Sequence, residues 1–346
     1  GSYQVGLGKL TPFLLLAVFL MVIKALETEK KCRALVLQGG GDLGSYQVGV
    51  LKAFVDNLPK EETNWDVITG VSVGSINAAS IGLHEIGEEV AAVDWMLSLW
   101  RKFGKTDIYR NWRFGPLQGL FFKPGLWDNT AEGEYLAEQF KEFPDKKLKR
   151  RININTVDID TGEVYKYKED VDFDTLPKAV RASSSMPFAF PHTHLDGHSF
   201  VDGGSVWNID LPGAIKRCKE IVEDDKDIII DIVLCNAANK VPFKEHKQYT
   251  AINNFGRYQQ IRSYYYSISD YLETKRGFPE VNFRYVVSPQ QDLPGGFLPL
   301  DFNHDSMLEM IEIGIKEGEQ AINDKRNTFD DFLQSSQSDM MFADYK

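Results

Sequence analysis

The chain of 346 residues contains little cysteine: Cys32, Cys218 and Cys235 are its only three, and they lie far apart in the sequence. Three widely spaced cysteines do not form the pattern of a disulfide framework, and no two are close enough for a zinc-binding motif. We therefore expect three buried free thiols. The sequence also has no Asn-x-Ser/Thr sequon, so glycosylation gives no support for secretion.

Positive charge is also scarce, because 39 Lys and Arg residues stand against 50 Asp and Glu residues, a net charge of −11. This balance argues against a nucleic-acid partner, since phosphate binding needs a basic surface. It also gives no overall attraction to an anionic membrane, so any lipid contact has to be local and apolar. Hydrophobic residues make up 43% of the chain and aromatic residues 12%, which is enough for a sizeable core.

The first 30 residues differ from the rest. After Lys9, residues 10–23 carry no charge, a run that is too short to span a bilayer comfortably because spanning takes about 20 residues. Such a run is typical of a secretory signal peptide, with Ala25 as the cleavage edge, although Ile23 is larger than the residue preferred there. We expect residues 1–30 to direct the chain into the secretory pathway or out of the cell; a membrane anchor through residues 10–23 is the alternative.

The rest of the chain shows no internal repeat and no long linker, which favours one domain over residues 31–325 and a loose tail over residues 326–346. Its first apolar run, residues 33–37, predicts a buried parallel strand, and the helical pattern of residues 45–54 follows.

The glycine-rich loop between this strand and helix has three conceivable uses. Gly39, Gly41 and Gly44 satisfy G-x-G-x-x-G, which opens dinucleotide-binding folds. That fold wants an acidic residue at the end of the next strand, where this chain has Thr69-Gly70-Val71-Ser72, and a nucleotide triphosphate loop wants a lysine that is missing. The third use is an oxyanion hole, because consecutive glycines let backbone N–H groups face a cavity.

Residues 65–80, WDVITGVSVGSINAAS, predict a strand, a sharp turn and a tightly packed helix. Gly70 and Gly74 flank Ser72 in a G-x-S-x-G pattern and leave room for a strained turn. Ser72 is therefore expected on a nucleophile elbow, with the free N–H groups of the helix start aimed at the reacting oxygen.

A carboxylate follows later, where the run Phe200-Val201 predicts a strand that delivers Asp202 to a loop opened by Gly203 and Gly204. Asp-Gly-Gly alone is a common turn, but beside Ser72 and the glycine loop it predicts a base that approaches another backbone closely.

Two apolar segments remain open to more than one interpretation. Residues 103–127 are rich in Gly, Pro and aromatics, which fits either a flap over an apolar substrate cleft or an irregular excursion packed on the core. Met186, Phe188, Phe190 and Pro191 are suited to an acyl pocket, and core packing explains them equally well.

Taken together, the order and spacing of GGGDLG (39–44), GVSVG (70–74) and DGG (202–204) resemble the patatin-like phospholipase family, as do DIDTGE, ASSSMPFAFP and the late LDF…MIEIG stretch. The resemblance covers most of residues 33–322. It implies an α/β fold, a three-layer α/β/α sandwich with a mostly parallel central sheet. It also implies lipid acyl hydrolysis by a Ser–Asp dyad, without metal or cofactor, on a lipid ester at a membrane or micelle surface.

Carried onto this sequence, the resemblance makes Ser72 the nucleophile and Asp202 the base. The backbone N–H groups of Gly40, Gly41 and Asp42 would hold the oxyanion, and the motif glycines would be Gly39, Gly44, Gly70, Gly74, Gly203 and Gly204. One position departs from the family, which often has Arg or Lys where this chain has Leu43. The departure makes a less anionic substrate, such as a neutral glyceride, more plausible.

Two alternatives stay open. A Ser–Asp–His triad would follow the chain order of α/β-hydrolases with His304, and His192, His194 and His198 also lie near Asp202 in sequence. A catalytically silent lipid-binding or storage protein is the second alternative. Head group, acyl length, positional preference, transfer to water or to another lipid, and oligomeric state are not encoded in these patterns.

Overall fold

The computed structural model describes residues 30–235, 251–294, 300–325 and 327. The predicted signal peptide or anchor and almost all of the predicted tail lie outside these residues. Contacts within the chain group residues 32–346 into one unit and residues 1–31 into another. In the described ranges, no helix combines the length and the apolar character that crossing a bilayer demands.

A mixed sheet of eight strands forms the centre of the larger unit, in the order β5-β6-β3-β2-β1-β7-β8, with β4 also paired to β3. Five strands are parallel neighbours: β1 (Cys32–Leu37), β2 (Val67–Val71), β3 (Arg151–Asp158), β7 (Ile228–Val233) and β8 (Asn282–Val287). The other three pair antiparallel: β4 (Val164–Tyr167), β5 (Thr193–Leu195) and β6 (His198–Asp202). The prediction of a mostly parallel sheet is confirmed.

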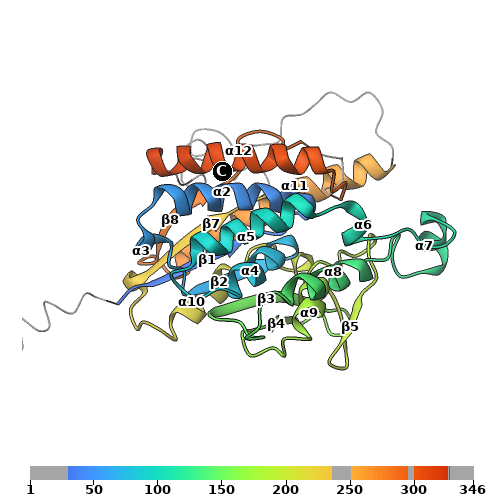
Figure 1. Ribbon diagram of the computed structural model, residues 1–346, viewed down its shortest axis with the longest axis horizontal. Coiled ribbons are helices and arrows are strands. Elements are labelled where there is room, and N and C mark those ends of the chain that lie inside the picture. Colours follow the sequence, from blue (N-terminus) through green and yellow to red (C-terminus); the bar gives the residue numbers. More distant parts are fainter. Residues whose placement is uncertain (1–29, 236–250, 295–299, 326, 328–346) are drawn as a thin grey trace, which may run out of the picture. The chain divides into compact units, whose positions relative to one another are not determined.

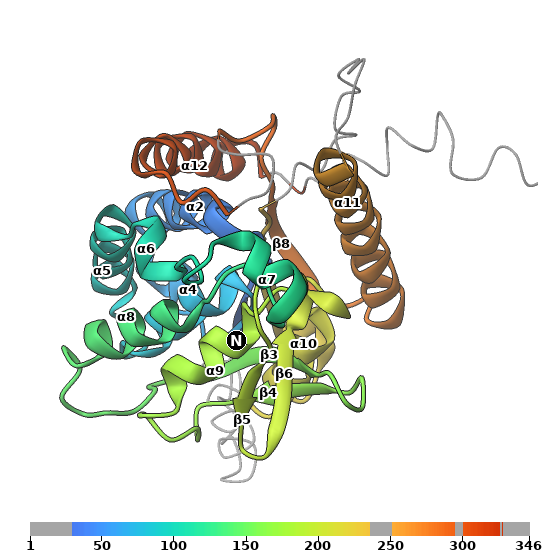
Figure 2. The same cartoon turned by 90° about the vertical axis from the view of Figure 1, so that its right-hand side faces the viewer.

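Helices cover both faces of this sheet (Figures 1 and 2). One face carries α2 (Gly44–Asn57), α4 (Val73–Gly82), α5 (Glu89–Lys102), α8 (Thr130–Phe140), α9 (Leu176–Ser183) and α12 (His304–Asp324). The other carries α10 (Leu211–Cys218) and α11 (Ala251–Gly277). The short helices are η1 (Gly41–Leu43), α3 (Lys60–Thr63), α6 (Lys105–Ile108), α7 (Pro116–Phe122), η2 (Gly203–Ser205) and η3 (Asp225–Asp227). The expected α/β/α sandwich is the observed one.

Two hydrophobic cores lie on either side of the sheet, and β1 contributes to both. Leu35 and Leu37 join one core, while Ala34 and Val36 join the other. A parallel strand that is buried on both faces has apolar residues at nearly every position. This explains why residues 33–37 form a continuous apolar run in the sequence.

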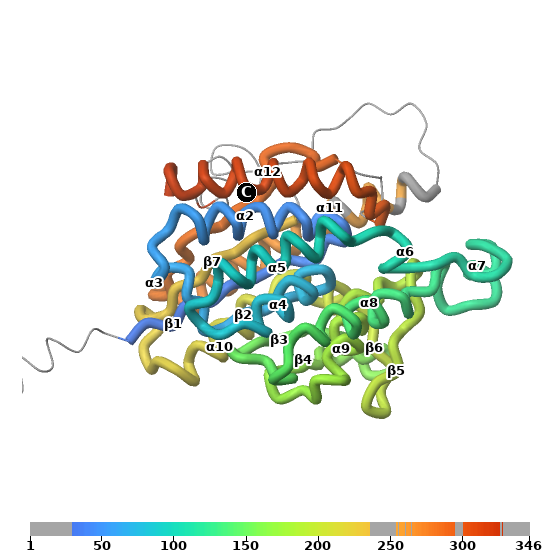
Figure 3. Tube along the Cα trace, viewed as in Figure 1, coloured from blue at the N-terminus to red at the C-terminus, as the bar shows by residue number. Residues whose placement is uncertain are grey.

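The helices α2 and α12 lie side by side although they come from opposite ends of the folded unit (Figure 3). A Cβ on Gly49 of α2 would come within 2.1 Å of the Ile311 carbonyl oxygen, and one on Gly314 of α12 within 2.2 Å of the Tyr46 carbonyl oxygen. Only glycine permits backbones to approach this closely. The late MIEIG stretch is thus part of the same core as the glycine loop.

The expectation of three free thiols was wrong for two of them. Cys32, the first residue of β1, forms a disulfide with Cys218, the last residue of α10, and Cys235 remains a buried free thiol. The two residues are 186 positions apart in sequence and have a Cα–Cα distance of 5.5 Å. The pairing depends on α10 packing against the start of β1, which cysteine spacing does not reveal.

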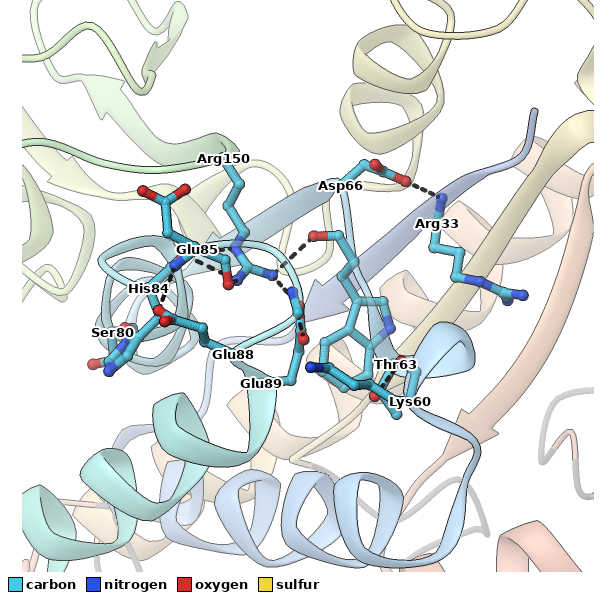
Figure 4. A network of polar contacts seen from close by, with 12 residues as sticks. Arg33, Lys60, Thr63, Asp66, Ser80, His84, Glu85, Glu88, Glu89 and Arg150 are labelled. Atoms are coloured by element: carbon cyan, nitrogen blue, oxygen red, sulfur yellow. Dashed lines mark hydrogen bonds and ion pairs between the residues drawn. The ribbon is translucent and has the colours of Figure 1, made fainter.

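A buried ion pair stabilises the edge of the sheet where the parallel strands begin (Figure 4). Arg150, which precedes β3, lies 2.7 Å from Glu89 and also donates to the carbonyl oxygens of Trp65, His84 and Glu85. Helix α5 begins at Glu89, and the turn before it presents the carbonyl oxygens of His84 and Glu85 to the guanidinium.

Candidate active site

Ser72 lies on the turn between β2 and α4, in a backbone conformation that side chains rarely adopt, with φ 53° and ψ −126°. The flanking glycines allow the chain to turn here. A Cβ on Gly70 would come 2.2 Å from the Gly74 carbonyl oxygen, and one on Gly74 would come 2.4 Å from the Leu37 carbonyl oxygen. The strained serine between two obligatory glycines has the geometry of a nucleophile elbow.

Neighbouring serines hold the backbone of this turn. The Ser72 N–H donates to Ser183 Oγ at 2.9 Å, and Ser183 Oγ in turn donates to the Asn155 carbonyl oxygen at 2.6 Å. Ser75 Oγ donates to the Ser72 carbonyl oxygen at 2.5 Å. Both backbone groups of Ser72 are therefore fixed by side chains, which leaves its hydroxyl free to face the cavity.

Asp202 closes β6 and is 6% exposed. Its Oδ1 accepts the Gly204 N–H at 2.7 Å, and the Ser72 hydroxyl is a second polar neighbour of the carboxylate. Burial raises the pKa of Asp202 to about 6 from its ordinary value of 3.8, although both neighbours act in the opposite direction. Burial therefore makes this carboxylate a stronger base than an exposed aspartate.

The sheet order explains why residues 130 positions apart meet. Strand β3 lies between β2 and β6, with Val71 paired to Asn155 and Asp202 paired to Thr156. Ser72 and Asp202 are thus at almost the same level on either side of β3, two strand spacings or about 9.5 Å apart in backbone. The side chains of Ser72 and Asp202, which line the same cavity, span a backbone separation of this size.

The glycine loop follows β1 and lies against the same region. Gly41 has φ 60°, which favours glycine, and a Cβ on Gly39 would come 2.5 Å from Asn208 Oδ1. Asn208 fixes the loop from both sides: its Nδ2 donates to the Gly39 carbonyl oxygen at 3.0 Å, and its own carbonyl accepts the Gly39 N–H at 3.2 Å. No sequence pattern had marked Asn208 as a positioning residue.

These elements border a cavity of about 450 Å³. Ser72, Asp202, Gly39, Gly40 and Gly41 line it, whereas Asp42 is buried and its carboxylate accepts the Phe302 N–H at 3.2 Å. The apolar part of the wall includes Ile76, Ile108, Met186, Phe188, Phe190, Leu300 and Phe302. Of the four residues that suited an acyl pocket, Met186, Phe188 and Phe190 lie in this wall, and Pro191 is outside it.

A second carboxyl group lines the cavity and was missed in the sequence. Glu132 of α8 is 1% exposed; Ser184 Oγ donates to its Oε1, and its Oε2 has no hydrogen-bond partner among the described residues. Burial raises the pKa of Glu132 to about 8 from 4.5, and the nearby Asp202 charge adds to the shift. Glu132 therefore holds its proton at neutral pH.

Of the histidines, the five that the structure describes all lie outside the cavity wall, and His246 is outside the described residues. His198 Nδ1 is 2.7 Å from Asp158 Oδ2, and His192 contacts His194. His304 is exposed at the start of α12. In the same ranges no three His, Cys, Asp or Glu residues gather as metal ligands.

Proteins of known sequence or structure that are similar to this chain include the following three. It is 24% identical over 301 residues to an uncharacterized protein, R571, of Acanthamoeba polyphaga mimivirus, covering 85% of this chain and 95% of that one. It is 29% identical over 226 residues to triacylglycerol lipase 4 of Saccharomyces cerevisiae, covering 58% of this chain but only 24% of that one. The structure also matches VipD from Legionella pneumophila, with a TM-score of 0.40 and 10% identity, over 86% of this chain and 67% of that one.

The family itself is shown by a sequence model. The model for patatin-like phospholipases matches residues 35–215, more than half of the chain, including the glycine loop, the Ser72 turn and the Asp202 strand. This match confirms the resemblance carried by the three motifs. The chain belongs to the patatin-like phospholipase family.

Proposed function

We propose that the chain hydrolyses carboxylic ester bonds of phospholipids or acylglycerols, with Ser72 as nucleophile and Asp202 as general base. The observation that carries the proposal is that Ser72 and Asp202 are neighbours in the wall of one cavity, together with the glycine loop and many apolar side chains. The family and the yeast lipase relative support lipid acyl hydrolysis in general.

In the first step Asp202 takes the Ser72 proton as the hydroxyl oxygen attacks the ester carbonyl carbon. The raised pKa of Asp202 favours this transfer while leaving the carboxylate ionised at neutral pH. The alcohol portion of the lipid leaves with a proton returned by Asp202, and an acyl-enzyme remains. Water that gives its proton to Asp202 then releases the fatty acid and restores Ser72.

The negative charge on the tetrahedral intermediate needs donors fixed in advance. We assign this role to the backbone N–H groups of Gly40 and Gly41, because both residues line the cavity together with Ser72. A contribution from the N–H of Asp42 stays a prediction, since Asp42 itself does not line the cavity. Each such donor typically contributes about 2.7–4 kcal/mol to the stability of the transition state.

Whether the substrate carries an anionic head group depends on the cations near the cavity. The glycine loop has Leu43 where the family often has Arg or Lys. Leu43 made a neutral glyceride plausible, yet Arg262 of α11 lines the cavity and lies 5.0 Å from the centre of the Tyr266 ring. An Arg at the cavity wall supports a phosphate-bearing head group as well. An Arg262→Gln variant should lower hydrolysis of phospholipid more than hydrolysis of diacylglycerol; equal losses on both would place Arg262 outside head-group recognition.

The decisive experiment compares the wild type with Ser72→Ala on a panel of phospholipids and acylglycerols, with released fatty acids measured by mass spectrometry. We expect Ser72→Ala to lower turnover by at least about 10³-fold and to abolish labelling by a fluorophosphonate. Ser269→Ala, an exposed serine on α11, is the matched control and should behave as wild type. Normal turnover in Ser72→Ala would refute the nucleophile, and a wild type that neither turns over nor labels would favour the silent lipid-binding alternative.

We also propose that the protein enters the secretory pathway. The Cys32–Cys218 disulfide supports an oxidising compartment, because such bonds seldom persist among reduced cytosolic thiols. Mass spectrometry of the protein from its native source tests this: a mature N-terminus near Ala25 is expected, and a retained residue 10–23 segment would instead support the anchor.

A further inference from the structure

The segment between α6 and α8 carries an unusual exposed apolar surface. Its apolar tip consists of five side chains that are between 51% and 81% exposed: Phe114, Leu117, Leu120, Phe121 and Phe122. Four of them belong to α7, which Figure 1 shows projecting beyond α6. Soluble proteins rarely expose apolar side chains in such a contiguous group unless the group is a binding surface.

Contacts among residues 110–128 hold the tip in place. Arg110 and Asp128 exchange two backbone hydrogen bonds, at 2.9 and 3.0 Å, which close the segment where it leaves the body. Trp112 Nε1 donates to the Gly125 carbonyl oxygen at 3.0 Å, and a Cβ on Gly119 would come 2.4 Å from the Leu126 carbonyl oxygen. Backbone and packing contacts therefore fold the segment, and its apolar side chains remain outside that packing.

The same segment is joined to the wall of the cavity. The N–H groups of Leu126 and Trp127 donate to the carbonyl oxygens of Phe188 and Ala189, both at 3.0 Å. Phe188 and Ile108 line the cavity, and Phe188 is itself 48% exposed. The segment that carries the tip is thus bonded to the wall of the cavity that Ser72 and Asp202 also line.

Charge on this segment is opposite to that of the chain as a whole. Residues 109–129, between α6 and α8, contain three exposed basic residues, Arg110, Arg113 and Lys123, against one acidic residue, Asp128, in a chain with a net charge of −11. Two of the cations lie over aromatic rings of the segment, Arg113 over Phe114 at 5.5 Å and Lys123 over Trp112 at 5.0 Å. An apolar tip with Arg113 and Lys123 beside it suits the boundary between acyl chains and anionic head groups.

We propose that the apolar tip inserts into an anionic lipid surface and docks the cavity on it, with Arg113 and Lys123 contacting the head groups. The proposal deepens the proposed lipid hydrolysis by naming the surface through which substrate is reached. A second copy of the chain is a poorer occupant, because a symmetric dimer through the tip would bring two basic segments together.

The direct test places an environment-sensitive fluorophore on the tip of the full chain, through Leu117→Cys, and on an exposed control position, through Ile86→Cys. Ser72→Ala is included so that vesicles stay intact. With vesicles that contain phosphatidylglycerol we expect a blue shift at position 117 and none at position 86, weakened by high salt. This local readout is independent of any vesicle binding by residues 10–23. No shift at 117, or equal shifts at both positions, overturns the proposal.

A paired experiment separates docking from chemistry. The double variant Phe121→Ser/Phe122→Ser should lower partitioning of the tip onto vesicles by about 100-fold, since burying two phenylalanines favours partitioning by roughly that factor or more. The matched control is Ile86→Ser/Val90→Ser, whose side chains are 43% and 48% exposed on another surface. Both should keep wild-type hydrolysis of a water-soluble short-chain ester, and only the first should lose hydrolysis of vesicle lipid.

These outcomes distinguish the two proposals. Loss of vesicle hydrolysis with soluble-ester turnover intact supports docking through the tip. Vesicle insertion by a protein that hydrolyses no ester would leave the docking surface standing and refute the proposed function. Unchanged vesicle hydrolysis in Phe121→Ser/Phe122→Ser, or a concentration-dependent dimer that this variant abolishes, would refute docking on lipid.

Discussion

Replacing Glu132 by Gln tests whether the cavity holds a neutral carboxyl group. Glu132 is almost completely buried, accepts one hydrogen bond from Ser184 and leaves Oε2 without a partner among the described residues. Its pKa is raised to about 8, mainly by burial, against 4.5 for the free side chain. Gln has almost the same shape as protonated Glu and carries no charge at any pH.

The way in which Glu132 makes the free energy of unfolding depend on pH follows from proton binding. Because the pKa of Glu132 is higher in the folded protein, the folded form binds this proton more tightly than the unfolded chain does. The stabilisation of the folded protein by this proton on Glu132 is complete below about pH 4.5 and is lost progressively as pH rises toward 8. At about 1.4 kcal/mol per pH unit, the loss is about 3 kcal/mol at pH 7 and about 5 kcal/mol above pH 8.

Glu132→Gln should therefore match the wild type near pH 4.5 and exceed its free energy of unfolding by about 3 kcal/mol at pH 7. Urea unfolding at several pH values, with the disulfide intact, measures the difference. Glu89→Gln is the control, because Glu89 is similarly buried but paired with Arg150, and its loss should destabilise by about 3–5 kcal/mol. A Glu132→Gln variant whose advantage does not grow between pH 5 and 8 would refute a neutral Glu132.

Three further outcomes follow from the same geometry. Asp202→Asn should lower kcat by about 10²–10⁴-fold, and the wild-type kcat should fall as pH drops below about 6, where Asp202 gains its proton; a flat profile with an active Asn variant would remove it as the base. Gly70→Ala would place a Cβ 2.2 Å from the Gly74 carbonyl oxygen and should abolish labelling of the serine, whereas Gly277→Ala, with open space around it, should not. Cys218→Ser should lower the free energy of unfolding by about 5 kcal/mol, the chain-entropy value for so long a loop, and an unchanged Tm would contradict the disulfide.

The parts of the site that lie within one short stretch were predictable from sequence. Ser72 and its glycines form a local pattern whose turn, strand and helix are specified by neighbours, and the glycine loop after β1 is equally local. Asp202 required more, because only the order of strands β2, β3 and β6 brings it beside Ser72. The three motifs together supplied that information through the family resemblance.

The features that were missed depend on tertiary neighbours. Glu132 looks like an ordinary helical Glu, and Asn208 like a loop residue, until the fold places them against the cavity and the glycine loop. The disulfide of Cys32 depends on the position of α10. Sequence could name the aromatic residues of 103–127, but only the structure separates the packed Tyr109 from the exposed Phe122.

The cavity that raises the basicity of Asp202 also imposes a stability cost on the fold. Both Asp202 and Glu132 have raised pKa values because the same apolar surroundings disfavour their ionised forms, so ionising either at neutral pH opposes folding. At the end of the sheet where the parallel strands begin, the buried charges are paired instead, because Arg150 and Glu89 form a hydrogen-bonded ion pair there. Removing that pair should lower stability without moving the pH at which kcat falls. Replacing Glu132 by Gln should raise stability at pH 7 and also leave that pH unmoved, because Glu132 is already neutral near pH 6, where Asp202 titrates. A kcat profile displaced to lower pH in Glu132→Gln would instead mean that Glu132 is ionised beside Asp202.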